Sequence, residues 1–449
     1  MTVEVPMARS APRHSRAAAQ RSGVGSPAFR RLWWAWTVSL FGDGVRGVAL
    51  PLYVALQTRS PLAASAVTAA EVLPWLLFAL PAGAIVDRVG PRVVVAAAHT
   101  ARAVLTAGLV VTIVADVATV PILCAFAFTL TVGETFAYPA SQALMVELAG
   151  TDDLDRANAQ FYTVHTIALM LVGPLAAGAL VALGPALAFA LDGVSFVLAA
   201  ALVATLPNVG AATRSTTERR RLAADVREGV MVLWQVAGLR VLVLMVITAT
   251  IAASALNTLT SLYALEVLDL PTEYVPILLV AGAVGALLGT RVVPAAARRW
   301  GDGTVLVTSM GVLGVGAIVY GSYPVVAVAL LGNALFGIGV GGWNVLAAAR
   351  RQRLTPAGAM GRVSGAYRML AWGLMPVGAG LAGPLAVATT LGSVFVIVGV
   401  LVLAVLAVTA RSLLVTSGTR QPWTVPAADG QPTRPQRTGR RHGVSAATE

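Results

Sequence analysis

The chain has 449 residues, of which 57% are hydrophobic and 12% are charged, and its formal net charge is +12. Soluble domains carry about twice that charged fraction, so the composition excludes an ordinary soluble protein and favours a membrane protein. Every basic residue is Arg. A chain without Lys cannot be a Walker-type ATPase or form a lysine Schiff base.

The residue types that build metal and redox sites are scarce. Cys124 is the single cysteine, which excludes an internal disulfide and a cysteine-based metal site. The four His residues show no ligand spacing. We therefore expect no metal, no cofactor and no enzymatic activity.

Twelve apolar runs are long enough to cross a bilayer, because about 20 residues at about 1.5 Å rise span a hydrocarbon core of about 30 Å. They predict an all-α membrane protein with spans at residues 32–57, 62–86, 93–115, 119–139, 157–182, 185–206, 239–265, 273–295, 303–322, 324–348, 362–387 and 389–411. The predicted organisation is a basic N-terminal tail at 1–31, a six-helix bundle at 32–206, a central loop at 207–238, a second six-helix bundle at 239–411 and a C-terminal tail at 412–449, which we expect to be disordered.

The placement of Arg predicts the orientation in a cell (plasma) membrane. If the N-terminus is cytoplasmic, nearly all Arg residues outside the spans fall on the cytoplasmic side, and Arg59 is the exception. Both termini and the central loop are then cytoplasmic. These Arg residues face anionic lipid, so the basic charge needs no nucleic-acid partner. We expect the chain to be a monomer.

Charged residues within the predicted spans are concentrated in the first half. Asp43 and Arg46 in the first span are three residues apart, so they share a helical face near the midplane. They form either a self-neutralising pair that serves packing or a site that takes up protons or contacts substrate. Glu71 and Arg102 lie at similar depth in the next two spans, where an ion pair between them would satisfy both.

The turn between the second and third spans reads GAIVDRVGPR, and its glycines and charges are Gly83, Asp87, Arg88, Gly90 and Arg92. Glycine lets a short connection bend, and charge keeps it in water. This spacing resembles the loop between the second and third helices of the major facilitator superfamily of transporters. Pro91 stands where that family usually has a basic residue.

The resemblance implies that this turn is a latch between two rocking halves. Asp87 would pair with the start of the eleventh span near Arg362 when the cytoplasmic side is closed, and Arg88 or Arg92 would meet Glu147. The alternative is that these charges only hold the loop at the membrane surface.

Glu134 lies toward the cytoplasmic end of the predicted fourth span, close in sequence to Phe128, Phe136 and Tyr138. Aromatic faces attract cations, so this acid is a candidate contact for a cationic or amphipathic substrate. The alternative is an acid that meets cytoplasmic water. Asp192 is close to the outer start of the sixth span, where we expect it to reach water.

The fifth span contains Gly173, Pro174 and Gly178 in the string GPLAAG, which resembles the G-P-x-x-G-G motif of antiporters in the superfamily. Ala177 replaces the first glycine of the closing pair. Small residues let helices approach closely, and this packing role is sufficient to explain the string.

The second half has polar rather than charged span residues. Its candidates for lining a central cavity are Asn257, Asn333, Trp343 and Asn344, to which we add Tyr138 of the fourth span. Side-chain amides also bond neighbouring helices, and that role is an alternative for each Asn. His99 and His165 are expected to serve packing.

The two predicted bundles resemble each other in sequence. One constant shift places Gly83 on Gly289, Leu148 on Leu354 and Arg156 on Arg362. Duplication of a six-span unit explains these matches, although chance matching is an alternative in a sequence so rich in small apolar residues.

Several strings, among them FRRLWWAWTVSLFGDGV and LPWLLFALPAGAIVDR, resemble the drug and siderophore exporters of the superfamily, including macrolide-efflux and enterobactin-exporter-like proteins. The resemblance implies proton-coupled efflux of a drug-like or natural-product small molecule by alternating access. The rival hypotheses are a proton-coupled solute importer and a non-transporting membrane sensor or scaffold.

Overall fold

The computed structural model describes residues 23–150, 153–207, 222–356 and 359–415, and within these ranges the secondary structure is helical with no strand. The predicted tails therefore lie mostly outside the described residues. The elements are α2 (Pro27–Thr58), α3 (Pro61–Val89), α4 (Pro91–Val114), α5 (Val120–Ala149), α6 (Leu154–Ile167), η2 (Ala168–Val172), α7 (Gly173–Leu183), α8 (Pro185–Ala204), α9 (Leu222–Gln235), α10 (Ala237–Glu266), η4 (Thr272–Tyr274), α11 (Pro276–Trp300), α12 (Asp302–Ser322), α13 (Val326–Leu354), α14 (Met360–Gly373), α15 (Met375–Ala388) and α16 (Leu391–Val415).

The prediction of an all-α protein with twelve spans is confirmed. In the described part of the chain, 12 helical segments are long and apolar enough to cross a membrane. The fourth and tenth spans are longer than predicted, since α5 extends to Ala149 and α13 to Leu354. The predicted central loop contains the helix α9 before the seventh span begins.

Proline sets the start of many of these helices. It occupies an N-terminal position of α2, α3, α4, α8 and α11, where its fixed φ suits a helix and no intrahelical N–H bond is lost. Ser26 adds a side-chain cap, because its Oγ accepts a hydrogen bond from the backbone N–H of Phe29 at 3.1 Å. Pro91 is such a starting residue, which explains why a proline replaces the basic residue in the GAIVDRVGPR turn.

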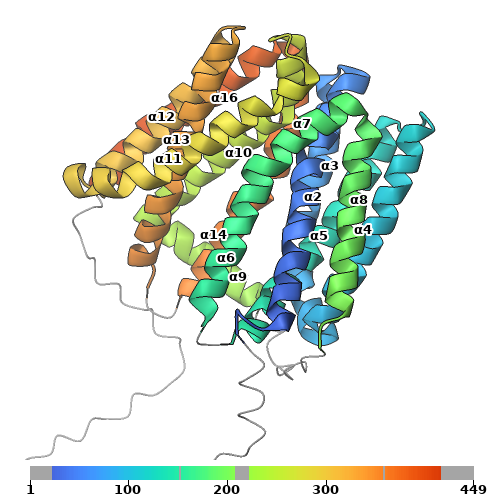
Figure 1. Cartoon of the computed structure of the whole chain (residues 1–449). Coiled ribbons are helices and arrows are strands. Elements are labelled where there is room, and N and C mark those ends of the chain that lie inside the picture. The colour runs from blue at the N-terminus through green and yellow to red at the C-terminus, as the bar shows by residue number, and fades with distance from the viewer. Residues whose placement is uncertain (1–22, 151–152, 208–221, 357–358, 416–449) are drawn as a thin grey trace, which may run out of the picture. The chain divides into compact units, whose positions relative to one another are not determined.

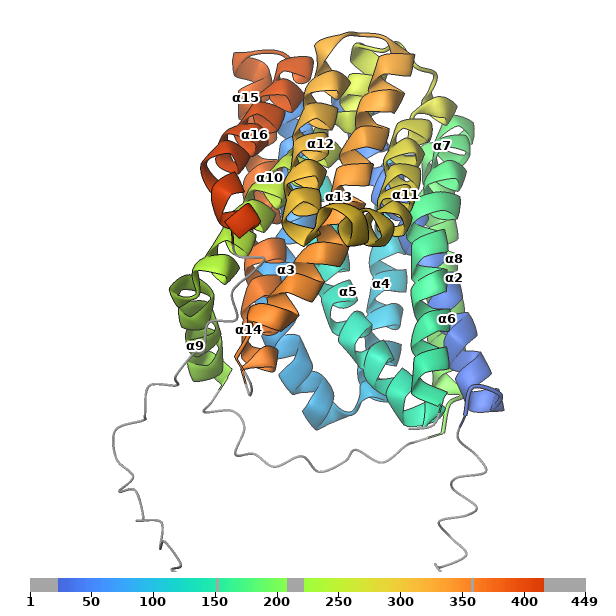
Figure 2. The same cartoon turned by 90° about the vertical axis from the view of Figure 1, so that its left-hand side faces the viewer.

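Consecutive spans run in opposite directions (Figures 1 and 2). Gly90, Gly150 and Gly301 therefore lie at one end of the bundle, called here the basic end, and Arg59 and Gly184 lie at the opposite end. In the first half α8 packs against α2 and α4, and α3 packs against α5. In the second half α13 packs against α11 and α12, and α12 packs against α16. The two halves meet mainly through α3 with α15, α2 with α10, and α7 with η4 and α11.

The helix bounds repeat between the two halves. The shift that relates Leu148 to Leu354 also relates the first residues of α5 and α13, of α6 and α14, and of α8 and α16. At the turn after the second span the shift is slightly larger. There Gly90 and Gly301 are each the single residue between two helices, with φ of 94° and 81°. Gly289 therefore does not occupy the place in the second half that Gly83 occupies in the first, although the sequence shift pairs the two residues.

The fifth and eleventh spans are interrupted at equivalent places. A short π-helical segment, η2, separates α6 from α7, and Leu374 separates α14 from α15. At the first interruption α2 crosses closely, because a Cβ on Gly173 would lie 2.6 Å from the Cα of Gly44. At the second, the Ser254 hydroxyl donates to the carbonyl of Met375 at 2.7 Å. Such breaks are common at functional positions in helices.

Candidate functional site

Six charged side chains of the first half converge between α2, α3, α4, α5 and α8, and we call this group the ionic cluster. Its members are Asp43, Arg46, Glu71, Arg102, Glu134 and Asp192. Both arginines are buried, with side-chain exposures of 3% for Arg46 and 1% for Arg102. The predicted charge candidates are thus brought together, with Asp192 added.

Arg46 is the centre of the ionic cluster. Its Nη1 donates to Glu71 at 3.0 Å, and its Nη2 donates to Glu134 at 2.8 Å and to Asp43 at 3.3 Å. Arg102 binds the Asp43 carboxylate through both terminal nitrogens, and its guanidinium lies 4.0 Å over the ring of Phe196. Two guanidiniums therefore share four carboxylates in a water-poor interior, where buried charges need partners.

Two details of the sequence prediction were wrong. The ion pair expected between Glu71 and Arg102 is not formed, because Arg46 reaches Glu71 and Arg102 is taken by Asp43. Glu134 lies near the middle of its helix rather than at its end, because α5 continues to Ala149. This depth is what lets Glu134 contact Arg46. The contact expected between Asp43 and Arg46 is present.

Sequence reasoning missed Asp192. We expected it to reach water, but its side chain is 0% exposed and faces Arg46 from α8. The signal that could have identified it is the cost of an acid inside an apolar span, which normally requires a partner or a cavity. His99 is also buried beside this group and stacks on Phe196 with ring centroids 5.8 Å apart.

A central cavity of about 810 Å³ lies between the two halves. It is lined by α2, α3, η2, α6 and α7 from the first half and by α10, α11, α13 and α15 from the second. Glu71 belongs both to this lining and to the ionic cluster, and its side chain is 18% exposed. The cluster therefore adjoins the cavity through one carboxylate.

The predicted cavity residues divide into two groups. Asn257, Asn333 and Asn344 line the cavity, and Asn333 also donates to the carbonyl of Leu278 at 2.6 Å, which is the helix-bonding role considered as the alternative. Tyr138 and Trp343 are not part of the lining. Tyr138 packs against Trp36 and Trp75 instead, and Trp343 is buried.

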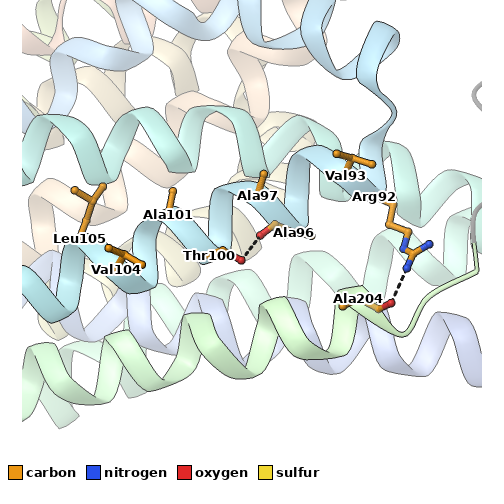
Figure 3. Close-up of a pocket in the computed structure, with 9 residues that line it drawn as sticks. All are labelled: Arg92, Val93, Ala96, Ala97, Thr100, Ala101, Val104, Leu105 and Ala204. Atoms are coloured by element: carbon orange, nitrogen blue, oxygen red, sulfur yellow. Dashed lines mark hydrogen bonds between the residues drawn. The ribbon is translucent and has the colours of Figure 1, made fainter.

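A second hollow, of about 950 Å³, lies on the outer face of α4 (Figure 3). Its lining is apolar apart from Thr100 and from Arg92, which donates to the carbonyl of Ala204 at 2.6 Å. Val93 and Val104 are exposed there, so this surface would face lipid in a bilayer. It is remote from the interface between the halves, and we do not consider it the substrate site.

Polar contacts between the two halves lie at the opposite end of the bundle. The Gly383 backbone N–H donates to the Ser65 hydroxyl at 2.5 Å, and Arg59 forms an ion pair with Glu266 at 3.3 Å. Gly178 of the predicted antiporter-like string lies where α7 meets η4 of the second half, because a Cβ there would be 2.9 Å from the carbonyl oxygen of Glu273. Pro174 of the same string lines the central cavity.

The residues of the predicted latch are not paired with one another in this conformation. Arg362 forms an ion pair with Glu228 of α9, and Asp87 is exposed and has no ion pair among the described residues. Arg92 donates to the carbonyls of Val203 and Ala204 at the end of α8, where the last carbonyls of a helix lack the usual partners four residues on. The latch pairing thus stays a prediction for a different conformation.

The expected contact of Arg88 or Arg92 with Glu147 is also not formed, and Glu147 Oε2 is buried without a hydrogen-bond partner among the described residues. The second half has an ion pair at the corresponding place with the charges reversed. There Arg353, at the end of α13, binds Asp302, the first residue of α12. An ion pair at this junction is therefore geometrically possible in this fold.

The comparisons with known proteins agree with this architecture. A family model described as Major Facilitator Superfamily matches residues 32–380. The multidrug efflux pump Tap of Mycolicibacterium fortuitum is 29% identical over 362 residues, which cover 79% of this chain and 88% of that pump. A pump of the same description from Mycobacterium bovis (strain BCG / Pasteur 1173P2) is 28% identical over 388 residues, which cover 84% of this chain and 90% of that pump.

Solved structures at low identity share the fold. The nucleoside transporter NupG has a TM-score of 0.68 at 15% identity and covers 86% of this chain and 98% of its own. The family model spans most of the chain, and the twelve spans and repeated helix bounds match the architecture of such transporters. The chain therefore belongs to the Major Facilitator Superfamily and is a multi-pass membrane transporter.

Proposed function

We propose that the protein exports an amphipathic, drug-like small molecule in exchange for protons, by alternating access. The observation that carries the proposal is the position of Glu71, which lines the central cavity and is bonded to Arg46 of the ionic cluster. A cationic substrate in the cavity would compete with Arg46 for this carboxylate. Substrate binding and protonation of the cluster would then depend on each other.

The cavity has the properties that such a substrate requires. Its volume of about 810 Å³ is within the range of drug-binding pockets. Its lining combines apolar side chains with three Asn amides, several hydroxyl groups, the imidazole of His165 and the carboxylate of Glu71. The similarity to the Tap efflux pumps supports export of a drug-like compound.

Protons supply the energy in this proposal. Each proton that enters down a tenfold concentration gradient releases about 1.4 kcal/mol. Exchange of one proton for one monovalent cation moves no net charge, so the pH gradient is the driving force. Asp43 and Glu134 are the proposed proton or substrate residues, because both are bonded to Arg46 and Glu134 is partly exposed.

We further propose that the basic end faces the cytoplasm, as the Arg distribution predicts. Since the halves are bonded at the opposite end, this conformation would be inward-facing. In the outward-facing conformation the basic end would close, and Asp87 would approach Arg362.

Transport assays in proteoliposomes test the proposal, with the cationic dye ethidium as the probe and an imposed pH gradient as the driving force. Wild-type protein should accumulate the dye against its gradient. Asp43→Asn and Glu134→Gln should each abolish this accumulation while membrane insertion is unchanged. The matched control is Asp116→Asn, because Asp116 is an exposed acid in a turn outside the cluster with a positive φ that Asn also adopts.

The direction of accumulation separates an exporter from an importer. The residue assignment is contradicted if both amide variants still accumulate the dye at the wild-type rate. The function itself is contradicted if wild-type protein shows no gradient-driven transport of ethidium or of any compound in a chemically diverse drug panel.

A further inference from the structure

The side chain of Asp192 is the one carboxylate of the ionic cluster that no arginine satisfies. It is 0% exposed, and neither of its oxygens has a hydrogen-bond partner among the described residues. The nearest cation is Arg46, whose Nε lies 3.8 Å from Oδ2, which is too long for a hydrogen bond. Asp43, Glu71 and Glu134 each accept at least one hydrogen bond from an arginine.

The charges around Asp192 do not balance if every acid is ionised. The charged groups that act on it are Asp43 and Arg46 on α2, Arg102 on α4 and Glu134 on α5, and Glu71 on α3 completes the cluster through its bond to Arg46. The Ser195 hydroxyl on its own helix donates to a backbone carbonyl. The two arginines are permanently charged and compensate only two of the four carboxylates. An uncompensated buried charge is costly, and protonation of the acid removes it.

We infer that Asp192 is the proton-binding residue of the coupling step: it carries a proton in the empty inward-facing conformation and releases it when substrate binds. This inference rests on the proposed function and assigns its proton to Asp192, which does not line the cavity, instead of to Asp43 or Glu134, whose carboxylates hold Arg46. Arg46 connects the two sites, because its Nη1 bonds the cavity acid Glu71 while its unpaired Nε faces Asp192.

The exchange follows from competition for Arg46. A cationic substrate that binds Glu71 weakens its bond to Arg46, and the freed guanidinium moves toward Asp192. The O–H bond of the Asp192 carboxylic acid then breaks, the proton passes to water, and the carboxylate pairs with Arg46. After the substrate leaves, Arg46 returns to Glu71 and Asp192 takes up a proton again. One positive charge enters the site and one leaves it.

Proton release on substrate binding tests the inference directly. Purified protein in weakly buffered detergent solution is mixed with ethidium, and a pH indicator reports released protons. Wild-type protein and the control Asp116→Asn should release protons, and Asp192→Asn should lose the release. Ethidium affinity should depend on pH in the wild type and depend on it less steeply in Asp192→Asn, while ethidium binding itself is retained. A merely structural Asp192 would leave the release and the pH dependence intact.

The outcomes distinguish this inference from the proposed function. If wild type and Asp192→Asn both transport ethidium under a pH gradient and release protons equally, the Asp192 assignment is overturned and the function stands. If wild type neither transports nor releases protons, both are overturned. If Asp192→Asn fails to fold, infrared spectra of wild-type protein with isotope-labelled aspartate test the inference instead. A protonated aspartic acid band should then decrease when ethidium binds, and the absence of that band overturns the inference.

Discussion

Arg46 holds the ionic cluster together, because its guanidinium lies within 3.8 Å of carboxylate oxygens from four residues on four helices. The sequence identified five of the six members by one physical criterion, the cost of charge inside an apolar span. It identified one contact among them, that of Asp43 with Arg46, and not the contacts between different helices. The partner of Arg46 depends on how α2, α3, α5 and α8 are rotated and crossed, and a single span does not encode that.

Removal of Arg46 should destabilise the protein strongly. In Arg46→Met, buried carboxylates lose their shared donor, and loss of one partner of a buried ion pair typically costs about 3–5 kcal/mol. The loss of thermal stability should be larger at pH 8 than at pH 5, because protonation at low pH neutralises the stranded carboxylates. Melting temperatures in detergent at the two pH values measure both effects.

Arg59→Met is the control for this variant. Arg59 is 76% exposed in its ion pair with Glu266, and an exposed pair contributes about 0–1 kcal/mol. Equal melting temperatures for the two variants at pH 8 would contradict the central role of Arg46.

At the scale of elements, glycine determines how closely the helices of the two halves approach. A Cβ on Gly383 of α15 would lie 2.4 Å from the carbonyl oxygen of Pro61 on α3, whereas a Cβ on Gly380 of the same helix meets nothing within 4 Å. The sequence indicated small-residue packing in these spans. It did not indicate which glycines face the other half, because that depends on the rotation of each helix about its axis.

Gly383→Val should therefore disturb the contact of α3 with α15. The variant cannot keep the bond from the Gly383 N–H to the Ser65 hydroxyl without a shift of the helices, so this conformation is disfavoured. We expect slower gradient-driven dye transport and a lower melting temperature. Gly380→Val carries the same helix-propensity change and should resemble the wild type. If Gly383→Val and Gly380→Val had the same transport rate and melting temperature, the close approach of α15 to α3 would have no role.

At the scale of the whole molecule, the two halves are bonded to each other at the opposite end. Arg59 precedes α3 and Glu266 ends α10, so their ion pair joins the first half to the second. In an alternating-access cycle this contact must break each time the opposite end opens.

A covalent link at this contact should stop transport. Arg59→Cys and Glu266→Cys, combined in a Cys124→Ala background, provide the only two thiols for a short bis-maleimide reagent. The cross-linked protein should lose dye transport and still bind ethidium from the basic end. The single variant Arg59→Cys, treated with the same reagent, should keep its transport. Full transport after complete cross-linking would exclude opening at this end.

The sequence by itself determined the membrane class and the twelve spans, and it indicated a repeated architecture that the helix bounds then supported. These follow from local properties, because each span needs its own run of about 20 apolar residues and each short turn needs its own glycine or proline. The tertiary structure decided what the charges do. It placed Asp192 against Arg46 instead of in water and joined the ionic cluster to the cavity through Glu71. It also left Asp87 without an ion pair among the described residues, while the opposite end is bonded. These features depend on which helix faces meet, and in a span that is apolar on every side the residue pattern does not specify which face turns inward.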